Sequence, residues 1–159
     1  MNPLGVLARR LGTATWFSRV FKFAVPMDTA LHRLTSGRFG LADVASVNGL
    51  LLTTTGRHSG EQRTVPLLFV QSPKGYVVAG SNWGGQTHPG WSANLLTDPT
   101  ASVTVRGRHE QVTARLAVDA ERDECWALLR EHWPAYDTYA ERADREIRVF
   151  VLEPVGAVS

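Results

Sequence analysis

The chain has 159 residues, of which 43% are hydrophobic and 20% charged, as expected for a single globular domain with a sizeable core. Its one cysteine, Cys125, excludes an internal disulfide framework and suits a reducing cytoplasm. Four of the 17 basic residues lie in residues 1–27, which contain no acid, so the rest of the chain has 13 basic against 15 acidic residues. The sequence therefore predicts no general polyanion-binding surface, and no nucleic acid partner.

Residues 1–25 form a basic segment with an amphipathic pattern, which Pro26 ends. No apolar run reaches the roughly 18–20 residues needed to span a bilayer, and the segment lacks a clean signal peptide. It suits peripheral contact with an anionic membrane, such as the inner face of the cell membrane. The alternative is a helix packed on its own domain or a frayed tail. We expect residues 26–159 to form one further domain.

The expected elements of that domain are mostly strands. A short helix over residues 28–34 and a turn at Asn48-Gly49 precede strands at 50–55, 63–71 and 76–81, with Pro66 at an edge or bulge. A helix at 89–96 leads to strands at 101–106 and 109–118, joined at Gly107-Arg108. A helix capped by Asp119 runs to residue 132, followed by a helical turn and a last strand at 148–154.

These six strands follow one another by hairpins, which favours antiparallel pairing in a small barrel with appended helices. The strand–helix alternation of a doubly wound fold is missing. The expected class is therefore mainly β within α+β. The chain also lacks the nucleophile motif G-x-S-x-G, and its five histidines show no metal-ligand spacing. We predict no metal site and no covalent nucleophile.

Two loops are richer in hydrogen-bond donors than a turn requires. The first reads TTTGRHSGEQRTVP over residues 53–66, and the second reads SNWGGQTHPGW over residues 81–91. Glycines allow backbone N–H groups to face an anion, and arginines grip phosphate or carboxylate with two hydrogen bonds. The second loop also opens a helix, whose N-terminus favours anions. A solvated basic hairpin is the alternative for the first loop, but the pair predicts one long, anionic, partly aromatic ligand.

Six aromatic residues complete the pattern: Trp83, Trp91, Trp126, Trp133, Tyr136 and Tyr139. Trp126 fits the core. Tyr136 and Tyr139 lie three residues apart after the helix-ending Pro134, so they can face a pocket, although simple packing explains each one equally well.

The order TTTGRHSGEQRTVPL, YVVAGSNWGGQTHPGWSANLLTDP and HWPAYDTYAERADREIRVFVLEP resembles the deazaflavin-dependent nitroreductase family of split β-barrel oxidoreductases. The resemblance covers residues 26–156, and its relatives are mostly actinobacterial. It implies a split β-barrel (FMN-binding-like) and a site for the reduced coenzyme F-420. That coenzyme is an 8-hydroxy-deazaflavin with a ribityl phosphate, a lactate and an oligoglutamate tail. FMN is a less favoured ligand.

The resemblance assigns roles to individual residues. The cofactor-binding set is Arg57, His58, Ser59, Arg63, Pro66, Leu67, Ser81, Asn82, Trp91 and Asn94. The substrate pocket would comprise Leu68, Trp83, Trp133, Tyr136 and Tyr139. Ser81, Tyr136 and Tyr139 would steady developing charge or supply a proton, so they are the candidate catalytic residues. The implied reaction is hydride transfer from the coenzyme to a small-molecule acceptor.

The chain departs from the family pattern at four positions. His58 and Asn82 stand where many relatives have basic residues, which lowers the charge around the phosphate. Leu68 and Trp133 replace aromatic residues of nitroimidazole-reducing members, which favours a quinone or enone over a bulky nitro compound. Two alternatives remain open: a flavin or haem (tetrapyrrole) carrier without turnover, and a membrane-docked module. Split barrels with exposed sheet often pair, so the protein is predicted to be a monomer or a homodimer.

Overall fold

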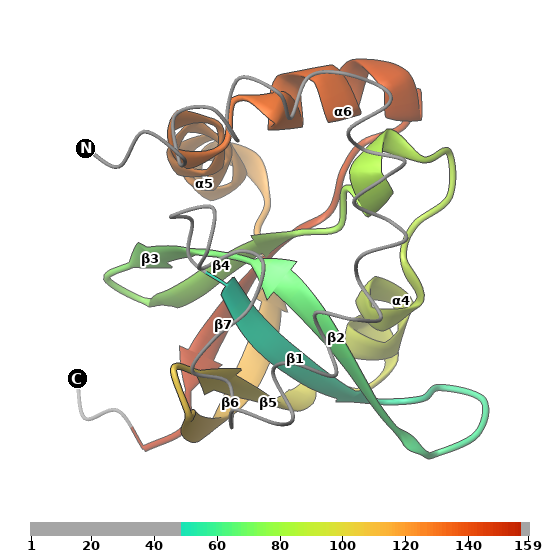
Figure 1. The fold of residues 1–159 in the computed structure, drawn as a ribbon, viewed down its shortest axis with the longest axis vertical. Coiled ribbons are helices and arrows are strands. Elements are labelled where there is room, and N and C mark those ends of the chain that lie inside the picture. Colours follow the sequence, from blue (N-terminus) through green and yellow to red (C-terminus); the bar gives the residue numbers. More distant parts are fainter. Residues whose placement is uncertain (1–48, 157–159) are drawn as a thin grey trace.

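The computed structural model describes residues 49–156, which form one antiparallel sheet and three α-helices (Figure 1). The predictions for residues 1–25, for the helix at 28–34 and for Asn48 lie outside the described residues. In chain order the elements are β1 (Gly49–Thr55), β2 (Gln62–Leu68), β3 (Val70–Ser72), β4 (Gly75–Ala79), η1 (Asn82–Gly84), α4 (Gly90–Thr97), β5 (Thr100–Val105), β6 (Arg108–Leu116), α5 (Asp119–His132), α6 (Ala135–Ala143) and β7 (Val149–Pro154).

The seven strands are arranged in the order β2-β1-β5-β6-β7-β4-β3, and every pair is antiparallel. The two strands at the ends of this order, β2 and β3, are neighbours in sequence, separated only by Phe69. Since one residue cannot cross a flat seven-stranded sheet, the sheet has to curl until its two edges meet. This confirms the predicted split β-barrel with appended helices.

The expected single strand at 63–71 is instead two strands, β2 and β3. Phe69 is only 9% exposed and packs edge-on against Tyr76, with ring centroids 5.2 Å apart. Burial of this ring accompanies the turn of the chain away from β1 and toward β4. Pro66 lies opposite Leu51 on the edge strand β2, as predicted, where its missing N–H faces no further strand.

Both faces of the strands β4 and β7 are buried. On β7, Val149 and Val151 belong to a cluster with α5 and α6, whereas Phe150 and Leu152 belong to a cluster with α4 and the inner face of β1. The alternation follows from the period of two along a strand, and it explains why the run VFVL is uniformly apolar. The helices α5 and α6 therefore cover one side of the sheet, above the strands in Figure 1, and α4 packs with the cluster on the other side.

The helix α5 is held to the sheet by an ionic network. Arg115 on β6 pairs with Glu121 on α5 and with Glu153 on β7, and Lys74 also pairs with Glu121. These cations lower the pKa of Glu121 to about 2. The predicted cap by Asp119 is wrong: Val118 precedes the helix and no side chain caps it, while Asp119 itself has a left-handed φ of 52°.

Candidate active site

Two adjoining pockets lie between the edge strand β2 and the loop that follows β4. The first, which we call the apolar lobe, encloses about 170 Å³ and is lined by Val65, Pro66, Leu67, Leu68, Ala79, Ser81, Asn82, Trp83, Pro89, Trp91, Tyr136 and Tyr139. The second, the polar lobe, encloses about 650 Å³ and is lined by Gly56, Arg57, His58, Ser59, Arg63, Val65, Asn82, Thr87, His88, Pro89, Gly90, Trp91 and Asn94. Four residues line both lobes: Val65, Asn82, Pro89 and Trp91. The two lobes therefore form one cleft with two chemically distinct ends.

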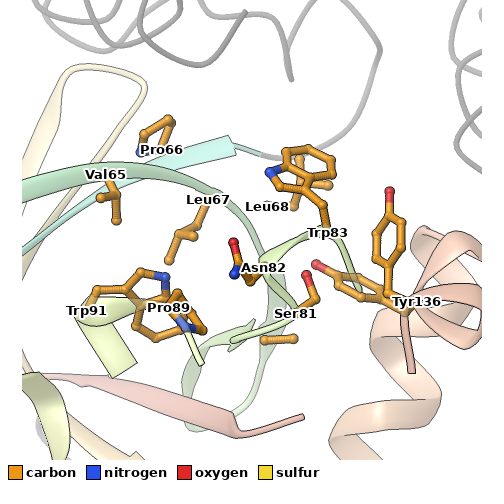
Figure 2. A pocket seen from close by; sticks show the side chains of 12 residues that line it. Val65, Pro66, Leu67, Leu68, Ser81, Asn82, Trp83, Pro89, Trp91 and Tyr136 are labelled. Carbon is orange, nitrogen blue, oxygen red and sulfur yellow. The ribbon is translucent and has the colours of Figure 1, made fainter. Parts of the chain in front are cut away.

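The apolar lobe has walls from three parts of the chain (Figure 2). One wall is β2, which contributes Val65, Pro66, Leu67 and Leu68. Figure 2 shows Trp91 and Pro89 at one end and Trp83 and Tyr136 at the other, with Ser81 and Asn82 between them. The lobe thus presents aliphatic and aromatic surface with a few polar groups at its centre, which is the usual composition of a site for a flat organic ligand.

The polar lobe is built on the loop between β1 and β2. The loop is closed by backbone bonds from the Gly56 N–H to the Glu61 carbonyl (2.7 Å) and from the Gly60 N–H to the Gly56 carbonyl (2.8 Å). Gly60 has a φ of 71°, a conformation that favours glycine. The closed loop leaves Arg57, His58 and Ser59 exposed at the rim of the lobe.

Arg57 is fixed by a buried amide on α4. The Asn94 Oδ1 atom accepts hydrogen bonds from the Arg57 backbone N–H (3.2 Å) and from Nη1 (3.1 Å), and Arg57 Nη1 also donates to the Gly90 carbonyl (3.3 Å). Asn94 is only 5% exposed, and its Nδ2 donates to Thr54 Oγ1 (3.1 Å). The amide therefore joins β1, the loop and α4, and it holds the guanidinium of Arg57 at the lobe. Asn94 acts on Arg57 as well as lining the pocket.

Arg63 is held much less firmly. Its guanidinium pairs with Glu61 at 3.2 Å, and the side chains of Arg63 and Glu61 are 60% and 70% exposed. Exposed pairs of this kind contribute little energy, so Arg63 can exchange Glu61 for another anion. No carboxylate lines the polar lobe within the described part of the chain, whereas Arg57, Arg63, His58 and His88 all do. The lobe is therefore suited to an anion.

The second loop contains a strained turn. Asn82, Trp83 and Gly84 have φ values of 45°, 54° and 79°, so three consecutive residues are left-handed. For residues other than glycine this conformation costs about 1–2 kcal/mol each. The turn is held by bonds from the Gly84 N–H to the Ser81 carbonyl, from the Gly85 N–H to the Asn82 carbonyl and from Asn82 Nδ2 to the Thr87 carbonyl. It sets the side chains of Ser81, Asn82 and Trp83 along the apolar lobe.

The aromatic end of the apolar lobe consists of Trp83 and the two tyrosines of α6. Tyr139 stacks edge-on with Trp83 and with Tyr136, with ring centroids 6.0 Å apart in each pair. Burial and the neighbouring Tyr139 raise the pKa of Tyr136 far above its usual value. Its phenol therefore stays protonated at neutral pH and can act as a hydrogen-bond donor, but not as a base.

Trp133 does not line either lobe. It is 3% exposed in the core cluster beneath α6, and its Nε1 donates to the Tyr139 hydroxyl at 3.4 Å. Trp133 therefore lies behind the pocket wall and supports Tyr139 instead of facing a substrate. The remaining predicted site residues all line one or both lobes. This placement brings the two donor-rich loops and the tyrosines together, and their individual roles stay predictions.

Sequence reasoning missed several residues of the cleft. Val65, Thr87, His88 and Pro89 line it. All four lie within the two loop motifs, which therefore carried a signal for them. Arg145 was also missed. It donates to carbonyls of the second loop, about 60 residues upstream. No spacing rule in the sequence indicates such a contact.

Comparisons with known proteins identify the family of the chain. The sequence profile of the family described as "F420H(2)-dependent quinone reductase" matches residues 27–154. A Mycobacterium tuberculosis protein named "F420H(2)-dependent quinone reductase" is 31% identical over 129 residues, which is 79% of this chain and 87% of the relative. A solved structure described as an "F420-H2 Dependent Reductase (FDR-A)" is 37% identical with a TM-score of 0.62, and the match covers 67% of this chain and 94% of that one.

Two further structures extend the comparison. A protein described as a domain-swapped dimer is 33% identical with a TM-score of 0.63, covering 80% of this chain and 96% of that one. The haem storage protein HutZ of Vibrio cholerae has a TM-score of 0.52 over 80% of this chain and 89% of that one, but only 16% identity. At that identity the likeness shows the fold alone and gives no support to a haem-carrier function.

The buried amide of Asn94 gives a testable prediction. Replacing it in Asn94→Ala removes the acceptor for Arg57 and the donor to Thr54, and we expect a loss of about 1–3 kcal/mol in the free energy of unfolding, measured by urea denaturation. Thr97→Ala, on the exposed side of the same helix, is the matched control and should stay within about 0.5 kcal/mol of wild type. Equal stabilities for the two variants would contradict this role of Asn94.

Proposed function

The chain belongs to the F420H(2)-dependent quinone reductase family, and we propose that the cleft binds the reduced coenzyme with its anionic part in the polar lobe and its ring in the apolar lobe. The protein is thus an oxidoreductase that transfers a hydride from reduced F-420 to a quinone. One observation supports the binding mode above all: Val65, Asn82, Pro89 and Trp91 line both lobes, so a single elongated molecule can occupy them together.

The residues present fit the coenzyme by their chemistry. Its phosphate and carboxylates need cations and N–H donors, which Arg57, His58 and Arg63 provide at the exposed end. Its flat ring needs apolar surface, which Pro66 and Leu67 provide on β2 and Trp91 provides on α4. Together the lobes lie in the range of about 300–1,000 Å³ that small-molecule sites occupy. The ligand's charge gradient therefore matches the charge gradient of the cleft.

The chemistry itself needs little from side chains. The bound coenzyme supplies a hydride, and a quinone that accepts a hydride and one further proton becomes a hydroquinone. The chain's task is to hold the acceptor against the ring, to exclude water and to stabilise the negative charge that develops on the quinone oxygen. We assign that last role to the protonated hydroxyl of Tyr136, helped by Ser81, with Tyr139 packed against Tyr136. Solvent at the open side of the cleft supplies the one proton that completes the hydroquinone.

The coenzyme site is tested by titrating the purified protein with F-420 and following the coenzyme's fluorescence. We expect Arg57→Ala to weaken binding about 10- to 100-fold, since charge-assisted hydrogen bonds are lost. The effect should be larger at low salt. Arg63→Ala should have a smaller effect because Arg63 is exposed and paired with Glu61. Arg108→Ala, at the distant β5–β6 turn with an 82% exposed side chain, is the control. No binding by wild type at tens of micromolar would refute the proposed function.

The role of Tyr136 is tested by Tyr136→Phe, which keeps the ring and removes the donor. We expect kcat for reduction of a soluble quinone to fall about 10- to 100-fold, with little change in the KM for the coenzyme. Tyr76→Phe is the matched control: its hydroxyl donates to Glu110 at 2.6 Å, and Tyr76 lines neither lobe. If Tyr136→Phe turns over like Tyr76→Phe, the donor is another group.

A cytoplasmic enzyme that reduces quinones benefits from contact with the membrane in which apolar quinones dissolve. We propose that residues 1–25, with four basic residues and no acid, provide this contact at the inner face of the membrane. Within residues 49–156, no helix is long and apolar enough to cross a bilayer. Sedimentation with anionic vesicles should carry down the full chain but not a chain lacking residues 1–25. Equal sedimentation of both would contradict the proposal.

A further inference from the structure

The strained turn at Asn82, Trp83 and Gly84 needs support from outside its own loop. Its internal hydrogen bonds fix the shape of the turn, but two of its left-handed residues are not glycines. Strained backbone of this kind persists only where the surroundings hold it, and it concentrates at functional sites. On the α6 side, the backbone of Tyr139 approaches so closely that a Cβ on Gly84 would lie 3.1 Å from the Tyr139 Cα atom. A second holding point is Arg145.

Arg145 holds both ends of the loop. Its Nη2 atom donates to the carbonyls of Gly80 (3.2 Å), Ser81 (3.2 Å) and Thr87 (3.0 Å), and its Nε atom donates to the carbonyl of Gly85 (3.2 Å). The guanidinium is planar and always charged, so a single rigid group ties four carbonyls before and after the turn. Since these carbonyls are directed toward Arg145, the intervening side chains of Ser81, Asn82 and Trp83 are left to line the apolar lobe.

The third nitrogen of the guanidinium engages His88. Arg145 Nη1 lies 3.1 Å from His88 Nδ1, and an arginine can only donate, so Nδ1 is unprotonated and the imidazole is neutral. Burial and the charges of Arg148 and Arg145 lower the pKa of His88, which supports the neutral form. His88 also lines the polar lobe, whereas Ser81 lines the apolar lobe. The guanidinium of Arg145 therefore contacts one residue from the lining of each lobe.

The partners of the half-buried Arg145 are four carbonyls and one imidazole. Within residues 49–156 it has no carboxylate partner, and all five of its acceptors are neutral. A buried cation with only neutral partners is costly compared with an ion pair. Arg145 lies two residues beyond the end of α6, and its hydrogen bonds within the described residues all go to residues 80–88. The geometry is that of a group whose task is to order a loop.

We propose that Arg145 is the positioning residue of this active site: by binding the four carbonyls and His88, it holds the left-handed turn and thereby fixes Ser81, Asn82 and Trp83 against the ligand. The consequence for catalysis rests on the function proposed above. The ordering of residues 80–88 does not, because it is a property of the free protein.

The test compares Arg145→Ala and Arg145→Lys with wild type, and Arg130→Ala, on the exposed face of α5, is the control. Amide hydrogen exchange reports the loop without any ligand. In Arg145→Ala we expect exchange within residues 80–88 to accelerate at least about 10-fold, with the strands of the sheet unchanged. Lysine keeps the charge but offers one compact ammonium in place of the planar fork, so Arg145→Lys should recover only part of the protection.

Kinetics give the second readout. At saturating coenzyme, single-turnover hydride transfer to a soluble naphthoquinone should slow about 10- to 100-fold in Arg145→Ala, while the coenzyme Kd changes less than about 3-fold. A slower hydride transfer with a nearly unchanged coenzyme Kd indicates that Arg145 positions the loop, whereas loss of a charge that binds the coenzyme would raise the Kd.

Several outcomes would overturn the proposal. Wild-type exchange of residues 80–88 in Arg145→Ala would do so, as would acceleration spread evenly over the whole chain. If Arg145→Ala fails to fold, Arg145→Lys decides the matter: exchange and hydride transfer at wild-type levels would mean that charge alone suffices. If wild type neither binds nor oxidises reduced F-420, the proposed function fails, yet the exchange experiment still decides whether Arg145 orders the loop.

Discussion

The closure of the sheet at Phe69 is the constraint on which the cleft depends. The chain leaves one edge strand, β2, and one residue later enters the other edge strand, β3. The two edges are therefore brought together, and β2 comes to face the loop that follows β4. Residues of the first loop and residues of the second loop, far apart in sequence, meet across this seam. A flat sheet with the same pairing would leave Arg57 and Ser81 at separate places.

The cleft is supported by buried and half-buried polar groups at and behind its walls. Asn94 ties Arg57 to α4 and β1, Arg145 ties both ends of the second loop together, and Trp133 donates to Tyr139 from the core. Each of the three side chains makes at least one bond to a residue that lines the cleft: Arg57, Ser81 and Tyr139 respectively. Because loops on their own are mobile, a site built from two loops requires such anchors if it is to hold a ligand in one geometry. The sheet determines where the cleft lies, and these three side chains hold the residues that line it.

The strands and most helices could be predicted because they obey local rules. Alternation and turn residues locate β1 and the β5–β6 hairpin, and Pro89 and Pro134 mark helix boundaries. The break of 62–72 into two strands was not predictable locally, since Phe69 is apolar and fits an uninterrupted strand. It is the pairing of β3 with β4 that requires the break, and this is a long-range property.

The candidate site shows the same division. Glycines, arginines and hydroxyls within short motifs indicated both loops, because donors in such numbers exceed what a turn needs. Trp133 was expected in the pocket because it lies three residues before Tyr136. Near a helix end, however, a shift of three residues is enough to place a side chain in the core instead of the cleft. Arg145 lies in a segment of alternating charge, DREIR, which reads as a solvated surface. Only the fold reveals that it faces loop carbonyls.

These placements separate the charged groups of the cleft from the lobe in which we propose that the hydride is transferred. The cations gather in the polar lobe, whereas the described lining of the apolar lobe contains no Asp, Glu, His, Lys or Arg, and burial raises the pKa of its Tyr136. A hydride moves most easily where water is excluded and no acid competes for it. Binding energy from the exposed anionic end can then hold the ring in a site that itself offers only weak, mostly apolar contacts. The same arrangement explains why the site needs no nucleophile and no strong base, and why a neutral conjugated acceptor such as a quinone suits it better than a charged one.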